Sequence, residues 1–237
     1  MRSHLFFGGP ATRTVKSLII INIAVFISQL VFRYLFDSRQ IEEVFGLSPL
    51  SVTYKLALWQ FVSYMFLHGS IGHIFFNMLT LYMFGNELVR YWGPRQFLVY
   101  YFVTGIGAGV CSWIVSMYSI SIVIGASGAI YGLLLAYGLS YPNRIVYLNF
   151  LFPIRVKWLV IIMGVVAFLS SITGSDPGVA SIAHLGGMII GYIYLKGRYW
   201  RARYSEFNAQ RRRDQLKRQF EVYYGDVRRK IDRDNKN

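Results

Sequence analysis

The chain is predicted to be an all-α, polytopic membrane protein, a bundle of six transmembrane helices. Of its 237 residues, 54% are hydrophobic and 17% aromatic, and the mean hydropathy is +0.39, which is too apolar for an ordinary soluble domain. A helix needs roughly 20 apolar residues to cross a hydrocarbon core, where every backbone polar group must be paired internally. Six apolar runs fit this description: 16–36, 70–89, 94–117, 126–141, 157–172 and 179–195.

The fourth and sixth runs are short for a membrane crossing. A helix that begins below the membrane surface is expected where the preceding loop is buried in protein or lines a water-filled cavity. Ser127 and His184 lie close to these two starts. Polar and ionisable residues at membrane depth are costly, by roughly 2.5 kcal/mol or more for a charged one, and are therefore interpreted as functional.

Basic residues in alternate loops predict the orientation of the chain. They precede the first run, follow the second and separate the fourth from the fifth: Arg2, Arg13, Lys16, Arg90, Arg95, Arg144, Arg155 and Lys157. By the positive-inside rule these loops face the cytoplasm. Both termini are therefore expected there, with Ser127 and His184 toward the outer leaflet.

The net charge of +14 comes largely from the segment after Leu195. We expect residues 1–15 to form a short cytoplasmic N-terminus, 16–195 the helical domain and 196–237 a basic cytoplasmic tail. A basic cluster beside a span is explained by topology and by attraction to anionic headgroups, so membrane lipids rather than nucleic acid are the expected partner. Apolar residues of the tail have the spacing of an amphipathic helix: Leu216, Phe220, Tyr223, Val227 and Ile231.

Ser127 is the candidate nucleophile. It lies in the run Gly125-Ala126-Ser127-Gly128, and flanking glycines permit a tight turn into a helix that leaves the hydroxyl and the backbone N–H groups accessible. Acyl transfer to water needs such a nucleophile, a base to take its proton, and donors aimed at the oxyanion. The alternative is a packing site, since small residues in membrane helices often serve that purpose.

His184 is the candidate general base. Glycines recur at helical spacing beside both candidates: Gly128 and Gly132 on the helix of the serine, Gly187 and Gly191 on the helix of the histidine. Glycine-lined helices can approach closely, which allows a hydroxyl and an imidazole to come within about 3 Å. Tyr131, one turn after Ser127, either stacks on the imidazole or packs between helices.

His73 and Asn77, at i and i+4 of the second run, are candidate oxyanion donors together with the Ser127 backbone N–H. A structural polar clamp between helices is the alternative for this pair. His68 lies just before the run. Because no His-Glu-x-x-His pattern or accompanying acid is present, we expect no metal and no cofactor. The economical interpretation is a Ser127–His184 dyad without an acidic third member.

Three motifs, in this order, resemble those of bacterial-type rhomboid intramembrane serine proteases. They are His68-Gly-Ser-Ile-Gly-His73-Ile-Phe-Phe-Asn77, then Gly125-Ala-Ser127-Gly128 with Tyr131, then Ala183-His184-Leu-Gly-Gly187-Met-Ile-Ile-Gly191. The resemblance extends from the first span to Leu195. Two positions depart from the family pattern. A Trp-Arg pair common in the first outer loop corresponds to Trp59-Gln60, and an acid common near the inner end of the second helix falls at Val89, with Glu87 nearby.

The resemblance implies a six-helix core in which Ser127 is the nucleophile, His184 the general base and acid, and His73, Asn77 and the Ser127 amide the oxyanion site. It also implies a multi-pass protein of the bacterial inner membrane, with a water-filled cavity open to the outer face. The implied substrate is a single-pass membrane protein, cut in or near its helix. Access beside the second and fifth helices makes Phe76 resemble a gate residue, although core packing explains it equally well.

Two other functions are compatible with parts of this pattern. A catalytically silent rhomboid-like protein would bind transmembrane helices with the same fold, and loss of the nucleophile or the base would be its signature. A small transporter or proton channel would account for buried histidines, but not for the Gly-Ala-Ser-Gly turn, and no acidic relay lines the spans. The predicted activity is therefore intramembrane serine endopeptidase. Its substrate and oligomeric state do not follow from the sequence.

Overall fold

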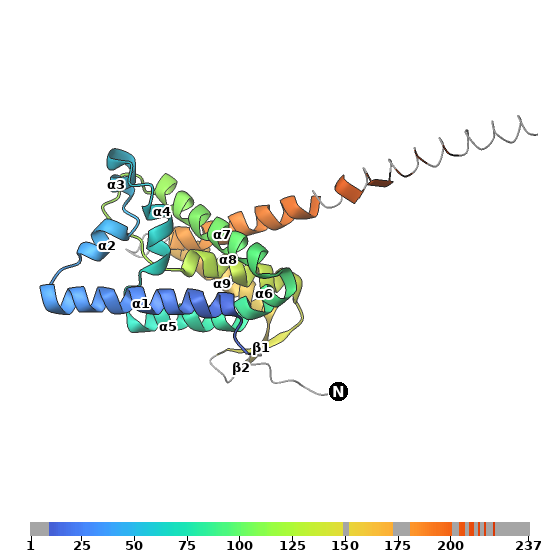
Figure 1. The fold of residues 1–237 in the computed structure, drawn as a ribbon, viewed down its shortest axis with the longest axis horizontal. Helices are drawn as coiled ribbons and strands as arrows, with labels where there is room; N and C mark the ends of the chain where they lie inside the picture. Colours follow the sequence, from blue (N-terminus) through green and yellow to red (C-terminus); the bar gives the residue numbers. More distant parts are fainter. Residues whose placement is uncertain are drawn as a thin grey trace, which may run out of the picture. The chain divides into compact units, whose positions relative to one another are not determined.

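The computed structural model describes residues 10–148, 152–172, 181–200, 204–206, 209–210, 213, 216 and 220. The chain divides into two compact units, Met1–Ile193 and Tyr194–Asn237. Helices dominate the first unit (Figure 1). In the second unit residues 194–200 are helical, whereas most of the amphipathic helix predicted between 216 and 231 lies outside the described residues.

Helices occupy all six predicted runs, which confirms the all-α polytopic fold. The five with printed bounds are α1 (Arg13–Phe36), the composite of α5 (Ile71–Thr80) with η2 (Leu81–Gly85) and α6 (Asn86–Trp92), α7 (Pro94–Val115), α8 (Ser127–Ser140) and α9 (Val156–Ile172). The sixth run is helical from residue 181, and residues 179 and 180 lie outside the described part. Among described helices, α1 and α7 are long and apolar enough to cross a membrane, while α8 and α9 are apolar but shorter.

Exposed apolar side chains on α1 and α9 are consistent with lipid as the surrounding solvent. Ile20 and Ile27 on α1, and Val165 and Phe168 on α9, each expose about half or more of their surface. Apolar surface of this extent is unusual on a soluble monomer, whereas hydrocarbon solvates it at no cost.

Four short helical segments fill the connection between α1 and α5: α2 (Gln40–Phe45), α3 (Pro49–Lys55), α4 (Gln60–Ser63) and η1 (Tyr64–Phe66). Gln60, at the position where the resemblance implies an arginine, has a buried side chain. Its amide accepts from Ser48 N–H at 3.0 Å and donates to the Val44 carbonyl at 3.1 Å, while Trp59 Nε1 donates to the same carbonyl at 3.0 Å. A neutral amide therefore connects this loop internally.

The described residues also contain a two-stranded hairpin, and an isolated antiparallel bridge between Leu47 and Val123. Strand β1 (Ile145–Leu148) pairs antiparallel with β2 (Phe152–Arg155) in the connection between α8 and α9. The sequence reasoning missed it because the segment is short and follows a long apolar run. Branched and aromatic residues such as Ile145, Val146 and Tyr147 favour extended backbone locally.

Glu87 is part of a polar cluster that joins α6, α8 and the start of the hairpin. Its carboxylate accepts a hydrogen bond from the Tyr137 hydroxyl at 3.0 Å and forms an ion pair with Arg144. Arg144 also donates to the Tyr137 hydroxyl at 2.9 Å. Glu87 thus joins α6 to the connection between α8 and β1. It lies two positions before Val89, the position where the resemblance implies an acid.

Helix α8 lies at the centre of the bundle, in contact with α5, η2, α7 and α9 (Figure 1). Its buried face is lined by small residues, including Gly128, Ala129 and Gly132. A Cβ at Gly132 would lie 2.7 Å from Thr104 Cβ of α7, so the two backbones approach more closely than larger residues permit. Helix α8 therefore begins deep inside the bundle.

Candidate active site

Ser127 is the first residue of α8. Gly125, two residues earlier, has φ +129, a conformation that L side chains rarely adopt, and its N–H donates to the Tyr64 carbonyl at 2.9 Å. The residues of this turn, Gly125 and Ala126, are buried, so α8 begins inside the protein. Because the first N–H groups of a helix have no partner within it, the backbone at Ser127 presents free donors beside the hydroxyl.

His184 lies on the helix that is described from residue 181. Its Nε2 is 2.7 Å from Ser127 Oγ, a hydrogen-bonding distance across 57 positions of sequence. When Nε2 is the unprotonated ring nitrogen, the serine hydroxyl donates to it. The structure therefore brings together the two residues that the sequence analysis selected as nucleophile and base.

Tyr131 stacks on the imidazole of His184. The ring centroids are 4.3 Å apart and the ring planes differ by 2°. Of the two interpretations left open for Tyr131, the observed contact is the one with the imidazole. Because one ring face is covered, the imidazole has little freedom to tilt away from Ser127.

The glycine pairs meet at only one point. A Cβ added at Gly187 would lie 2.0 Å from the Gly128 carbonyl oxygen, so these two glycines form the contact between the His184 helix and α8. Gly132 instead packs against Thr104, and Gly191 packs against the Tyr100 hydroxyl, where a Cβ would lie 2.4 Å away. The second glycine of each pair thus contacts α7, because α7 fills the space where the two helices diverge.

His73 lies on the first turn of α5, which is capped by the Ser70 hydroxyl. Its Nδ1 accepts from the Gly69 N–H at 3.4 Å, and its Nε2 lies 2.7 Å from the position that a Cβ on Gly125 would occupy. A side chain at position 125 would therefore collide with the imidazole. His73 thus faces the turn that leads to Ser127.

Asn77 follows one turn later on α5 and is 5% exposed. Its amide nitrogen has no hydrogen-bond partner among the described residues. A buried amide with an unused donor is available to an incoming acceptor.

His68 is fully buried and contacts the His73 ring edge-on, with ring centroids 5.0 Å apart. Within the described part of the chain, the His68 side chain makes no hydrogen bond to Ser127 or His184. His68 therefore supports His73 rather than meeting the candidate dyad itself.

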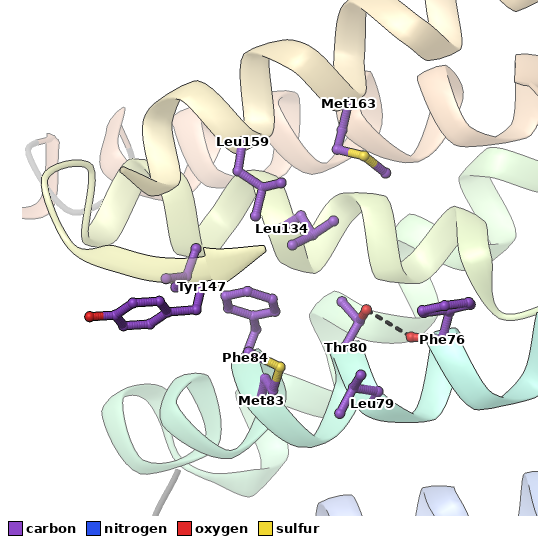
Figure 2. Close-up of a pocket in the computed structure, with 10 residues that line it drawn as sticks. Phe76, Leu79, Thr80, Met83, Phe84, Leu134, Tyr147, Leu159 and Met163 are labelled. Atoms are coloured by element: carbon purple, nitrogen blue, oxygen red, sulfur yellow. Dashed lines mark hydrogen bonds between the residues drawn. The ribbon is translucent and has the colours of Figure 1, made fainter. Parts of the chain in front are cut away.

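Phe76 is 62% exposed, which excludes core packing as its role within this unit. It lies at one end of an apolar cavity of about 290 Å³ between α5, η2, α8, β1 and α9 (Figure 2). Leu79, Met83, Leu159 and Met163 also line this cavity. The cavity is the space between the second and fifth predicted spans.

The sequence of this chain is similar to that of known membrane proteins. The family model of the rhomboid domain matches residues 55–201. The chain is also 30% identical over 210 residues to rhomboid protease AarA of Providencia stuartii, across 81% of this chain and 75% of that protein. The chain belongs to the rhomboid family. As a rhomboid protein it is membrane-embedded, and its relatives include proteins named as proteases.

Two further relatives match a smaller share of their own length. RHOMBOID-like protein 4 of Arabidopsis thaliana is 31% identical over 169 residues, which is 70% of this chain and 41% of that protein. Rhomboid protease GluP of Bacillus subtilis (strain 168) is 31% identical over 151 residues, which is 63% of this chain and 28% of that protein. The rhomboid chain thus spans less than half the length of these two relatives.

The sequence analysis overlooked several polar residues around this rhomboid site. Gln29 of α1 and Glu42 of α2 are buried and hydrogen-bonded to each other at 2.9 Å. Tyr64 is buried, and its hydroxyl donates to the Gly105 carbonyl at 2.7 Å. The available signal was Gln29 itself, a polar residue in the first apolar run, where polarity indicates a specific partner.

Proposed function

We propose that this rhomboid protein is an intramembrane serine endopeptidase that cleaves single-pass membrane proteins in or near their transmembrane helix. The observation that carries the proposal is the 2.7 Å separation of Ser127 Oγ and His184 Nε2 at the buried start of α8. A nucleophile next to a base, with the base oriented by a third group, is the arrangement that nucleophilic catalysis requires. Here the third group is the stacked ring of Tyr131 rather than an acid.

In this mechanism Ser127 attacks the scissile carbonyl while His184 Nε2 accepts the hydroxyl proton. His184 then donates that proton to the leaving amine, which departs and leaves an acyl group on Ser127. Water repeats the sequence on the acyl-enzyme, with His184 again as base and then as acid. The free carboxylate is released and the serine hydroxyl is restored.

The oxyanion of each tetrahedral intermediate needs donors that are already in place. We assign this role to the Ser127 backbone N–H, His73 and Asn77. The face of His73 toward Gly125 and the unused donor of Asn77 support the assignment. Removing one such donor typically costs about 10²–10³ in kcat.

The cavity of Figure 2 supports lateral access for the substrate. It is apolar and opens between α5 and α9, as a helix arriving from lipid would require, and Phe76 lies at its edge. Charge in the loops supports an orientation with both termini in the cytoplasm and the site toward the outer face of a bacterial inner membrane. Anionic lipid headgroups are the proposed partners of the basic tail.

Reconstitution tests the activity. Purified protein in proteoliposomes is incubated with a single-pass substrate that carries small and helix-breaking residues near its outer end, alongside the Ser127→Ala variant. Cleavage by the wild type alone supports the protease. Folded wild type that binds several such substrates without cutting any of them would show instead a helix-binding rhomboid protein without catalysis.

The stack on His184 predicts a graded response at position 131. Tyr131→Ala removes the ring and is expected to lower kcat about three- to tenfold, the equivalent of an aromatic contact of 0.5–1.5 kcal/mol. Tyr131→Phe keeps the ring and is the matched control, with kcat close to that of the wild type. Equal kcat values for the alanine variant and the wild type would contradict an orienting role.

The domain boundaries extend the proposal: residues 16–195 carry the activity, and residues 196–237 do not contribute to the chemistry. The division of contacts after Ile193 supports this separation. Deletion of residues 206–237 is expected to leave kcat in detergent within about twofold of the full chain, because no catalytic group is removed. Loss of activity in a truncated protein that retains its helical circular dichroism spectrum would refute the boundary.

A further inference from the structure

Gln29 hydrogen-bonds both backbone polar groups of one residue, His68. This side chain of α1 is 1% exposed. Its Oε1 accepts from the His68 N–H at 2.9 Å, and its Nε2 donates to the His68 carbonyl at 3.3 Å and to Glu42 Oε1 at 2.9 Å. One acceptor and two donors are thus engaged, so the amide is anchored in one orientation.

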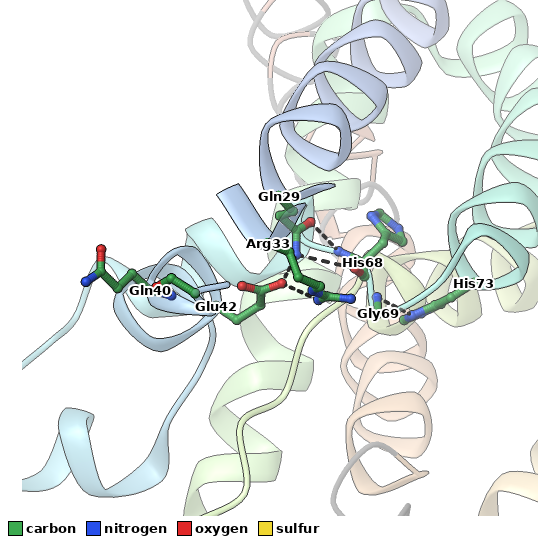
Figure 3. A network of polar contacts seen from close by, with 8 residues as sticks. Gln29, Arg33, Gln40, Glu42, His68, Gly69 and His73 are labelled. Atoms are coloured by element: carbon green, nitrogen blue, oxygen red, sulfur yellow. Dashed lines mark hydrogen bonds and ion pairs between the residues drawn. The ribbon is translucent and has the colours of Figure 1, made fainter. Parts of the chain in front are cut away.

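An ion pair connects these hydrogen bonds of Gln29 to the partly exposed Arg33. Arg33, one turn after Gln29 on α1, pairs with Glu42 Oε1 at 2.6 Å (Figure 3). Glu42 therefore receives two donors from α1 on one oxygen. The pair aligns the carboxylate that in turn orients the Gln29 amide.

The peptide that Gln29 holds leads directly to His73. Gly69 and Ser70 are exposed, so the backbone between η1 and α5 has its fixed point at His68. The Gly69 N–H donates to His73 Nδ1 at 3.4 Å, as Figure 3 shows. A ring nitrogen that accepts a hydrogen bond carries no proton, so in neutral His73 the proton lies on Nε2, the nitrogen that faces Gly125.

We infer that Gln29 is a positioning residue for His73: by holding the His68 peptide it aims the Gly69 N–H at Nδ1 and so keeps the Nε2 proton directed at the oxyanion site. The expected effect on kcat rests on the proposed function, whereas the expected effect on the His73 tautomer does not. Without Gln29 the His68 N–H and the His68 carbonyl each lose a side-chain hydrogen bond. The Gly69 donor then moves, and His73 can adopt the tautomer that presents an acceptor to the oxyanion.

Kinetics with a cleavable single-pass substrate test the catalytic consequence. Gln29→Met keeps the volume and removes the hydrogen bonds; it is expected to lower kcat about 10- to 100-fold with KM within about twofold, as partial loss of one oxyanion donor does. The matched control is Asn22→Leu, because Asn22 is a buried amide two turns earlier on α1 that bonds only to the Leu18 carbonyl among described residues. Its kcat should stay within about twofold of wild type.

A double variant separates positioning from general stability. In a His73→Ala background, Gln29→Met should cause no further loss of kcat, since the donor it positions is already absent. An additional loss equal to that in the wild type would overturn the inference. If Gln29→Met does not fold, Gln29→Asn replaces it: the amide is one methylene too short to reach the His68 peptide, but it keeps a polar group in place.

The tautomer of His73 gives a readout that does not depend on proteolysis. Ring nitrogen-15 NMR of the full chain, with His73 assigned by the signals lost in His73→Ala, should show protonated Nε2 and unprotonated Nδ1 in the wild type. Gln29→Met should shift this pattern toward a mixture, and Asn22→Leu should not. An unchanged pattern in Gln29→Met would overturn the inference, whereas absence of Ser127-dependent cleavage in the wild type would overturn only the proposed function.

Discussion

Alanine in place of Ser127 or His184 is expected to abolish substrate cleavage, with kcat falling by roughly 10⁴-fold or more. Ser127→Ala removes the atom that forms the covalent bond, and His184→Ala removes the acceptor 2.7 Å away that takes its proton. Because the two groups act as one unit, the double variant should be no worse than either single variant. Initial rates of cleavage in proteoliposomes measure all three values.

The matched control is Ser140→Ala, which alters the last residue of the same helix at an exposed position. Its kcat should equal that of the wild type. Cleavage by Ser127→Ala at a rate close to that of the wild type would exclude the serine as nucleophile. Losses that add fully in the double variant would show that Ser127 and His184 act in separate steps.

Alanine at Gly187 is expected to cost about 1–3 kcal/mol of stability, because the new methyl group overpacks a backbone contact. Its Cβ would lie 2.0 Å from the Gly128 carbonyl oxygen, and neither backbone can yield without moving its helix. Gly187 follows His184 by less than one turn, so the same displacement carries the imidazole away from Ser127. A misplacement of 1 Å can cost about 10²-fold in rate, so kcat should fall at least that far.

Thermal unfolding in detergent and cleavage rates measure these two effects. The matched control is Gly164→Ala on α9, where the nearest atom to a new Cβ is the flexible end of Met188 at 3.4 Å, an ordinary contact distance. It should leave both quantities near wild type, or raise stability slightly, since alanine favours a helix. Wild-type stability and rate in Gly187→Ala would contradict the close approach of the two helices.

The helical spans were predictable because each apolar run indicates a membrane helix without reference to the rest of the chain. Observed bounds such as Pro94–Val115 and Val156–Ile172 lie within a few residues of the predicted runs. The signal fails where a segment is short and its structure depends on a partner, as in the hairpin Ile145–Leu148 with Phe152–Arg155. The π-helical turn Leu81–Gly85 was missed for a related reason: apolar periodicity does not distinguish α from π geometry in a buried helix.

The glycines show the same contrast between what residue spacing predicts and what depends on a partner helix. Spacing along the chain indicated which glycines share a face, but not which helix that face meets. In the structure Gly187 meets Gly128, while Gly132 and Gly191 meet α7. Contact between helices depends on the crossing angle, and the crossing angle is a property of the whole bundle.

The class of this protein, its family and its candidate site residues were readable from residue order, because long apolar runs and the polar residues inside them can be interpreted one segment at a time. How those residues are held in place became visible with the packed helices. The stack of Tyr131 on His184 and the hydrogen bonds of Gln29 to the His68 backbone each join segments far apart in sequence. Such contacts follow from the packing of helices against one another, and residue order alone does not specify it.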